Sequence, residues 1–177
     1  MIAKTIICPF TIVIDSAESQ PFEFQGIRAD AAKKNAEIIV PTVWECLGRY
    51  PFSRGDYSIV GYQGRVGIER KSVEDCIGTV LGWGERRERF AGELSVLAGM
   101  ESACVIVEGS LGGCLEQMHD RGAKLIEANR KSFHRSIIAL QQDYRVPWIF
   151  CDSRRLAEVT AFRWFERFWK RAMKGIV

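Results

Sequence analysis

The sequence has few of the residues, and none of the spacings, on which zinc centres, disulfide frameworks and membrane anchors depend. Its two histidines, His119 and His134, form no ligand pair, and its six cysteines show no Cys-x2-Cys spacing. Scattered cysteines favour buried free thiols in a reducing compartment. No apolar run reaches membrane-spanning length, and the N-terminus lacks the clear charged region and cleavage site of a signal peptide. We therefore expect no membrane association and no secretion, and a location in the cytoplasm or at the nucleoid.

The sequence also lacks a large excess of either positive or negative charge. The 25 Lys and Arg residues nearly balance the 22 Asp and Glu residues, so the net charge is only +3. Bulk electrostatics therefore do not identify a nucleic-acid-binding protein, and the distribution of charge is more informative. The apolar fraction of 47% is ample for a core. The length predicts a single domain spanning residues 1–177.

The most informative stretch is GDYSIVGYQGRVGIERK at residues 55–71. Its period-two alternation predicts a β-hairpin closed by a two-residue loop at Gln63-Gly64. In that register Asp56 lies opposite Lys71 and Ser58 lies opposite Glu69, and opposite side chains share a face of the sheet. Asp56, Glu69 and Lys71 therefore share one face. The other face should pack on the core, and it carries Tyr57, Ile59, Val66 and Ile68.

Two carboxylates and a lysine on one face of a sheet suit phosphodiester chemistry. Mg²⁺ usually takes one or two carboxylates and keeps several waters, and Mn²⁺ accepts similar oxygen ligands. A cation held by Asp56 and Glu69 would polarise a phosphoryl oxygen and lower the pKa of a bound water. Lys71 would orient that water or stabilise negative charge in the transition state. The alternative is a solvated edge hairpin with surface ion pairs.

The same stretch, extended to GDYSI…GIERKSVED, resembles the signature of the XPF-family nuclease domain. That family carries GDY, a spacer, ERK, three residues and Asp, which match Gly55-Asp56-Tyr57, Glu69-Arg70-Lys71 and Asp75 here. The resemblance covers most of the chain, from IVIDSAESQPFEFQGI through RRERFAGELSVL and VIVEGS to VPWIFCDSRRLAEVTAFRWFERFW. The family belongs to the PD-(D/E)XK superfamily. The resemblance therefore implies an α/β fold with a restriction-endonuclease-like mixed β-sheet flanked by helices on both faces.

The resemblance also implies roles for individual residues. It makes Asp56 and Glu69 metal ligands and Lys71 a catalytic base or water positioner, with Glu18 in the same site and Asp15 in support. The family's D-x-R-E arginine is Ala17 in this sequence, which alters the electrostatics of that corner. Family members dimerise and usually carry a tandem helix-hairpin-helix module, which we do not expect in this chain because it stops at Val177. DNA-structure specificity would then come from the domain, its dimer or a protein partner.

Three supporting residues have a structural interpretation beside the functional one. Arg70 falls on the core-facing side of the hairpin, where a buried charge must be paired, so it either braces a carboxylate or contacts phosphate. Asp75 follows Ser72 by three residues, which is a variant of the helix capping box as well as a place to support the site. Asp15 ends an apolar run and either forms a turn or joins the site.

Basic residues follow the hairpin in two clusters. Arg86, Arg87 and Arg89 open a helix at the position where DNA phosphates would approach, and guanidinium groups suit such contacts. Alternatively they form a mixed-charge helix face stabilised by pairs with neighbouring glutamates. The second cluster either carries flanking DNA backbone or only solubilises the surface; it contains Arg121, Lys124, Arg130, Lys131 and Arg135.

Strands that alternate with helices toward the C-terminus predict a mixed α/β sheet with helices on both sides. We expect strands at 6–14, 38–43 (edge or irregular because of Pro41), 103–107 and 147–150, a short strand within 21–26, a loop or short helix at 28–34, and a loop at 109–122. Helices are expected at 72–79, 86–98, 129–143 and 154–173. The last helix carries Phe162, Trp164, Phe165, Phe168 and Trp169 on more than one stripe, which predicts either an intramolecular core helix or a homodimer interface.

These observations predict a Mg²⁺- or Mn²⁺-dependent DNA endonuclease, with specificity for branched, flap or fork DNA in repair, recombination or replication. One alternative is a non-catalytic DNA-binding or scaffold subunit with a nuclease-like fold, which Ala17 leaves open. A second alternative is a metal-dependent hydrolase of a smaller phosphoester. The arginine-rich helix favours a polymeric substrate over a small one.

Overall fold

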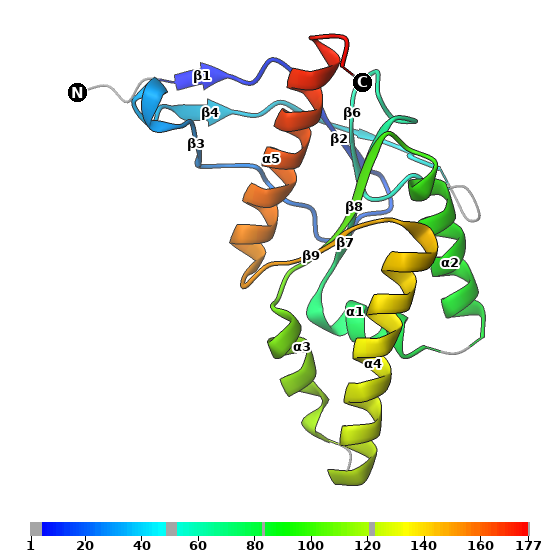
Figure 1. Cartoon of the computed structure of the whole chain (residues 1–177). Helices are drawn as coiled ribbons and strands as arrows, with labels where there is room; N and C mark the ends of the chain where they lie inside the picture. The colour runs from blue at the N-terminus through cyan, green and yellow to red at the C-terminus, as the bar shows by residue number, and fades with distance from the viewer. Residues whose placement is uncertain (1–4, 49–52, 83, 121–122, 177) are drawn as a thin grey trace.

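The computed structural model describes residues 5–48, 53–82, 84–120 and 123–176, and it contains two β-sheets and five α-helices within them (Figure 1). A small sheet has the strand order β1-β4-β3 and the main sheet has the order β5-β2-β6-β7-β8-β9. The strands are β1 (Thr5–Ile7), β2 (Ile12–Asp15), β3 (Ile27–Arg28), β4 (Glu37–Ile39), β5 (Thr42–Glu45), β6 (Tyr57–Ile59), β7 (Val66–Lys71), β8 (Ser102–Val107) and β9 (Trp148–Phe150). The helices are α1 (Val73–Val80), α2 (Glu85–Ala98), α3 (Leu111–Glu116), α4 (Ala123–Tyr144) and α5 (Arg154–Ala172), with short 3-10 turns at Ala31–Lys33 and Gln117–Asp120.

The main sheet is mixed and is covered by helices on both faces, as the sequence predicts. β2 is parallel to β5 and antiparallel to β6, β6 is antiparallel to β7, and β7, β8 and β9 run parallel. Residues of β8 alternate between two hydrophobic clusters. Cys104 and Ile106 pack with α5, whereas Val105 and Val107 pack with the helices α1 to α4. Because both faces of β8 are buried, its sequence is a nearly continuous apolar run.

Four expected elements differ from the structure. The strand expected at 6–14 is two strands in different sheets, since the chain changes sheet around Pro9 between β1 and β2. The segment 38–43 is likewise divided between β4 and β5 next to Pro41, because proline cannot donate to a β-ladder. No strand forms within 21–26, and residues 109–120 are not a loop but contain α3, whose first turn is capped by Ser110 Oγ.

The hairpin register also differs from the expected one, with a useful consequence. Tyr57 lies opposite Ile68 and the connection occupies residues 60–65, so the two-residue loop at Gln63-Gly64 is wrong. The shift amounts to two residues, which preserves the side-chain faces because strand side chains have a period of two. Asp56 consequently lies opposite Glu69 rather than Lys71, and its N–H donates to the Ile68 carbonyl at 2.8 Å. The two carboxylates are therefore closer neighbours than the sequence predicts.

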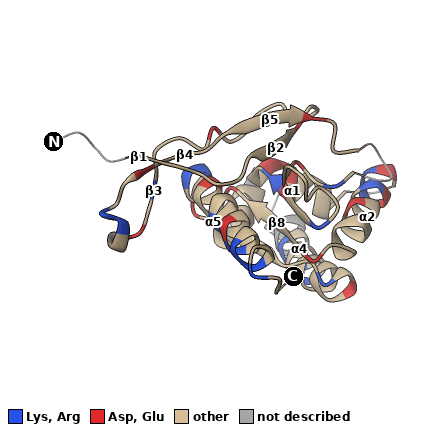
Figure 2. Cartoon of the chain, turned by 90° about the horizontal axis from the view of Figure 1, so that it is seen from above, with Lys and Arg blue, Asp and Glu red and all other residues tan. Residues whose placement is uncertain are grey.

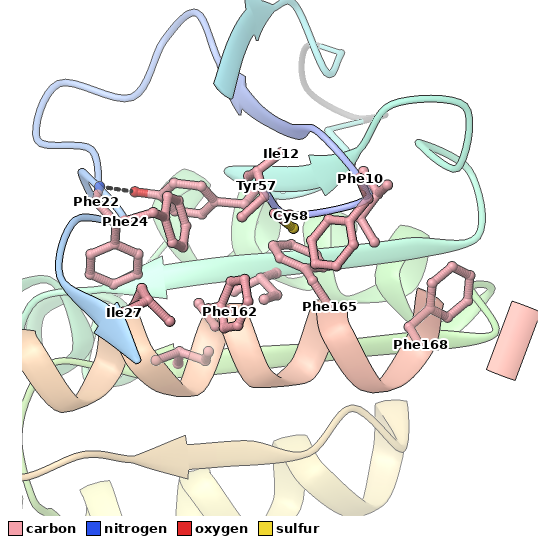
Figure 3. Close-up of a cluster of buried hydrophobic side chains, with 14 of the residues drawn as sticks. Cys8, Phe10, Ile12, Phe22, Phe24, Ile27, Tyr57, Phe162, Phe165 and Phe168 are labelled. Carbon is pink, nitrogen blue, oxygen red and sulfur yellow. Dashed lines mark hydrogen bonds between the residues drawn. The ribbon is translucent and has the colours of Figure 1, made fainter. Parts of the chain in front are cut away.

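Helix α5 lies against the main sheet and turns its aromatic stripe into the core. Phe162, Phe165 and Phe168 are each at most 2% exposed, and they pack with residues of β2, β6 and β7 (Figure 3). The interpretation of this helix as an intramolecular core element is therefore confirmed. Dimerisation through the same helix stays a prediction. No helix in the described parts of the chain combines the length and hydropathy that crossing a membrane requires.

Candidate active site

A pocket of about 740 Å³ opens on the face of the main sheet that α1 and α2 cover. Its floor comes from the end of β7, with Glu69 and Lys71, and from Asp56 just before β6. Its walls come from α1, α2 and the turn after β2. The pocket contains every predicted site residue except Arg87; those present are Asp15, Glu18, Asp56, Glu69, Arg70, Lys71, Asp75, Arg86 and Arg89.

The two residues that flank Asp56 explain why its carboxylate reaches this floor. Gly55 has φ +87°, and a Cβ atom there would lie 2.7 Å from the Ile68 carbonyl oxygen. Only glycine allows the chain to pass so close to β7 in this conformation. Tyr57 is fully buried on the opposite face, stacks on Phe22 at 5.2 Å, and accepts a hydrogen bond from the Phe22 N–H at 2.9 Å (Figure 3). The GDY string therefore positions one carboxylate with a structural residue on each side.

Asp56, Glu69 and Lys71 form a charge cluster with low exposure to solvent. Lys71 Nζ donates to Glu69 Oε1 at 2.7 Å, with side-chain exposures of 14% and 7%, and lies 4.8 Å from the centre of the Phe90 ring. Burial and the charge of Glu69 raise the pKa of Asp56 well above its usual value, although Lys71 opposes this. Burial by itself lowers the pKa of Lys71, but attraction to Glu69 outweighs it, so the pKa of the ammonium is raised. The cluster thus has an excess of buried negative charge.

Arg70 braces the other side of β7, in agreement with the structural interpretation of its position. Its guanidinium binds both oxygens of Glu18, at 2.7 and 2.9 Å, and Glu108 at 3.1 Å. Burial would raise the pKa of Glu18, yet the hydrogen bonds from Arg70 lower it overall. Glu108 also pairs with Arg154, which in turn donates to the carbonyls of Gln20 and Pro21. Glu18 lines the pocket with both oxygens engaged, so its help in catalysis stays a prediction.

Asp15 and Asp75 have structural partners as well. Asp15 accepts hydrogen bonds from the N–H groups of Ala17 and Leu47, so it shapes the turn after β2. Ser72 Oγ caps α1 by accepting from the Asp75 N–H at 3.0 Å, which confirms the expected Ser N-cap, and it donates to Asp75 Oδ2 at 3.1 Å. Asp75 also lies 3.5 Å from Arg86, and both side chains are more than half exposed at the mouth of the pocket. Asp75 and Arg86 therefore lie at the rim of the pocket and not at its floor.

The three arginines of α2 are not brought together. Arg86 and Arg89 line the pocket, and Arg89 Nε donates to Glu93 Oε1 at 3.2 Å. Arg87 instead lines a groove on the α4 side of the helix. Successive residues of a helix point about 100° apart, which explains the division. Figure 2 shows the mixed basic and acidic character of the first turns of α2.

Glu93 is a pocket residue that sequence reasoning treated only as an ion-pair partner. It is 8% exposed and lines the pocket beside Glu69. Burial, and then repulsion by Glu69, raise its pKa. Its position four residues after Arg89, on the helix that follows the predicted site, was the available signal. The approach of Glu93 on α2 to Glu69 on β7 depends on tertiary packing, and no local sequence pattern predicts it.

The donor set is suited to a hard divalent cation that keeps much of its water. Among the described residues no three His, Cys, Asp or Glu side chains converge closely enough to form a complete metal cage. Asp56 and Glu69 nonetheless lie opposite each other across β6 and β7, and burial together with the charge of Glu69 raises the pKa of Asp56, which a bound cation would offset. One or two carboxylates with several waters are the usual ligands of Mg²⁺. These residues therefore fit such a cation.

The comparisons with known proteins agree with this geometry. Residues 14–161 match the family model of the ERCC4 domain. Two solved structures of XPF from Aeropyrum pernix are similar: the complex with DNA (TM-score 0.56, 17% identity, 91% of this chain and 66% of that chain) and XPF alone (0.56, 18%, 94% and 68%). This chain thus spans about two thirds of the length of those XPF chains, and no curated protein matches it significantly in sequence. The chain belongs to the ERCC4 domain family of the restriction-endonuclease-like superfamily and has the fold of an XPF nuclease domain.

Proposed function

We propose that this chain is a Mg²⁺- or Mn²⁺-dependent DNA endonuclease of the repair-nuclease kind. The observation that carries the proposal is the pocket in which Asp56, Glu69 and Lys71 lie together on one face of β6 and β7. Membership of the ERCC4 domain family and the fold shared with XPF support it. One of the similar XPF structures is a complex with DNA, which supports the same polymer as the substrate here.

The side chains of the pocket have separate tasks in this proposal. Asp56 and Glu69 would hold the cation, which when bound supplies Lewis-acid polarisation of the phosphate and a lower pKa for water. Lys71, paired with Glu69 at 2.7 Å, is an ammonium group with three donors and no acceptor. It is therefore better suited to orient the attacking water, or to stabilise charge on the phosphate, than to accept a proton. Arg86 and Arg89 at the mouth would hold the neighbouring phosphates.

The finer points of the proposal concern the substrate and the assembly. We propose that branched, flap or fork DNA is cut, and that a second copy of the chain or a protein partner supplies the selectivity for such structures. The described pocket is open at the rim formed by Asp75 and Arg86, so a bulky polymer can enter it. A smaller phosphoester would leave Arg86 and Arg89 without a role.

The test is cleavage of end-labelled duplex, flap, fork and single-stranded DNA with Mg²⁺, Mn²⁺ or a chelator. We expect cleavage only with a divalent ion, and loss of cleavage in Glu69→Gln, which keeps the size of the side chain. The Glu74→Gln variant is the matched control, because Glu74 is exposed on α1 outside the pocket lining. If the wild-type protein binds these substrates but never cuts them, the proposed endonuclease activity is wrong.

A non-catalytic DNA-binding or scaffold subunit is the second candidate, and Ala17 is the observation that favours it. Ala17 lines the pocket where the resembled D-x-R-E pattern has arginine, so this wall lacks a cation from that position. Arg70 lines the same pocket, but its guanidinium is bound to Glu18 and Glu108. An Ala17→Arg variant separates the two candidates: a gain of cleavage in an inactive wild type would identify a degenerate nuclease, whereas an active wild type rejects the scaffold.

A further inference from the structure

A second hollow, the α2–α4 groove, lies on the other side of α2 from the pocket. It has a volume of about 480 Å³ and lies where α2 and α4 run side by side in Figure 1. Half of the α4 residues that line it have small side chains, among them Ser132 and Ser136. Small side chains leave the groove open to a partner of appreciable width, and serine hydroxyls supply hydrogen-bond donors.

Three cations from two helices line this groove. Arg87 comes from α2, and Lys131 and Arg135, one turn apart, come from α4; all three are exposed. Asp143 is the one acidic residue among the described residues that line the groove. Among the described lining residues, the positively charged side chains therefore outnumber the negatively charged one, although the net charge of the whole chain is only +3. A local excess of this kind attracts an anionic partner.

Helix α2 connects the α2–α4 groove with the pocket. Arg86 and Arg89 line the pocket, and Arg87 lines the groove, so the same two turns present cations on both sides of the helix. Lys131 and Arg135 are about 6 Å apart along the helix axis. A duplex strand presents one phosphate about every 3.4 Å of its axis, so this spacing covers neighbouring phosphates. A strand that crosses α2 would meet Arg86 and Arg89 on one side of the helix and Arg87 on the other, although Glu85 and Glu88 lie on the same turns.

We infer that the α2–α4 groove binds the phosphodiester backbone of the DNA that flanks the bond cut in the pocket. This inference rests on the proposed function, since it assigns a second contact region for the same substrate. The contacts are with phosphates and therefore position the DNA without reading its sequence. The groove contributes affinity, and the pocket contributes chemistry.

The test is the salt dependence of DNA binding by the triple variant Arg87→Gln/Lys131→Gln/Arg135→Gln, measured on duplex DNA in chelator. Each lost phosphate contact lowers the slope of log Kd against log salt by about 0.9, so we expect a decrease of about 2–3. The matched control removes three cations at the end of α5, on the opposite face of the sheet, as Arg167→Gln/Arg171→Gln/Lys174→Gln. The control is expected to keep the wild-type slope. Circular dichroism and thermal melting verify that both variants fold.

The outcomes separate this inference from the proposed function. Equal slopes for wild type and the groove variant, or equal decreases in both triple variants, would overturn the groove as a specific contact. Cleavage is scored separately with Mg²⁺ or Mn²⁺. A wild type that never cuts DNA, but whose binding loses salt dependence in the groove variant alone, would reject the endonuclease and retain the groove.

Discussion

Lys71 Nζ donates a hydrogen bond to Glu69 Oε1 at 2.7 Å. Within the described structure, the other oxygen of Glu69 has no side-chain hydrogen bond. Asp56 is in a similar state, because the Arg70 N–H binds its Oδ2 at 2.6 Å. Each carboxylate thus has one oxygen held by the protein and one available to a cation. This pairing fixes the orientation of both groups before any ligand arrives, which is the preorganisation that catalytic sites require.

Replacing Lys71 by methionine should separate chemistry from cation binding. The side chain keeps much of its length but loses the ammonium, and with it the contact of Nζ with the Phe90 ring. We expect single-turnover cleavage of DNA to fall about 10²–10³-fold, as for the loss of one electrostatic donor. Mn²⁺ binding measured by calorimetry should persist, because both carboxylates remain. Lys170→Met on α5 is the control, and cleavage by Lys71→Met at the wild-type rate would remove Lys71 from the mechanism.

Replacing Asp56 by asparagine should stabilise the protein when no divalent cation is present. Burial and Glu69 raise the folded-state pKa of Asp56, so the folded protein binds a proton more tightly than the unfolded chain does. Stability then falls as pH rises from the unfolded value near 3.9 through the raised folded value. The variant removes this charge repulsion and flattens that pH dependence. Its Tm in chelator should rise by about 2–4 °C for each kcal/mol gained.

The same variant should lose the stabilisation that a bound cation supplies. Wild-type Tm should rise with Mg²⁺ or Mn²⁺ concentration, because a ligand of the folded state stabilises by mass action. Asp56→Asn should show little rise, whereas Glu74→Gln, altered at an exposed carboxylate, should behave as wild type. A variant that is less stable than wild type in chelator at neutral pH would contradict the excess of negative charge at this site.

Arg70→Met should be among the most destabilising substitutions in the chain. It leaves Glu18 buried without its guanidinium partner and Glu108 paired with Arg154 alone, and breaking a buried ion pair costs about 3–5 kcal/mol. Urea unfolding followed by circular dichroism measures the loss. Arg65→Met is the control, because Arg65 pairs with Glu101 on the exposed surface and its loss should change stability little. Equal losses in the two variants would show that the brace is not structurally important.

Gly55→Ala should impair both folding stability and cation binding. The added Cβ meets the Ile68 carbonyl oxygen at 2.7 Å, and alanine is strained at φ +87°, which together cost about 1–3 kcal/mol or more. The shift also displaces Asp56, so Mn²⁺ affinity should weaken as measured by calorimetry. Gly64→Ala is the control, since a Cβ there meets nothing within 4 Å. An unchanged Mn²⁺ affinity in Gly55→Ala would show that Asp56 is positioned by other contacts.

The strand and helix types near the site follow from local pattern, and most were predictable. The alternation in 55–71 places Tyr57 and Ile68 on the core face, and Ser72 starts α1 where the capping pattern predicts. The hairpin register was not predictable, because the turn at residues 60–65 has no two-residue loop to set it. The helix α3 was missed since its sequence, LGGCLE, contains two glycines, and packing of Cys114 in the core overrides that weak propensity.

The sequence by itself determined which chemical groups this protein can use, since GDY and ERK specify two carboxylates and a lysine on paired strands. Only the tertiary structure decided which of them are available. Arg70 and Glu18 are 52 positions apart, and Glu93 reaches the pocket from a different helix. Such contacts depend on how helices pack on a sheet. Burial then shifts the pKa of each carboxylate, because it removes the water that would solvate the charge. No local periodicity encodes that exclusion of water, so the roles of these carboxylates emerge only from the fold.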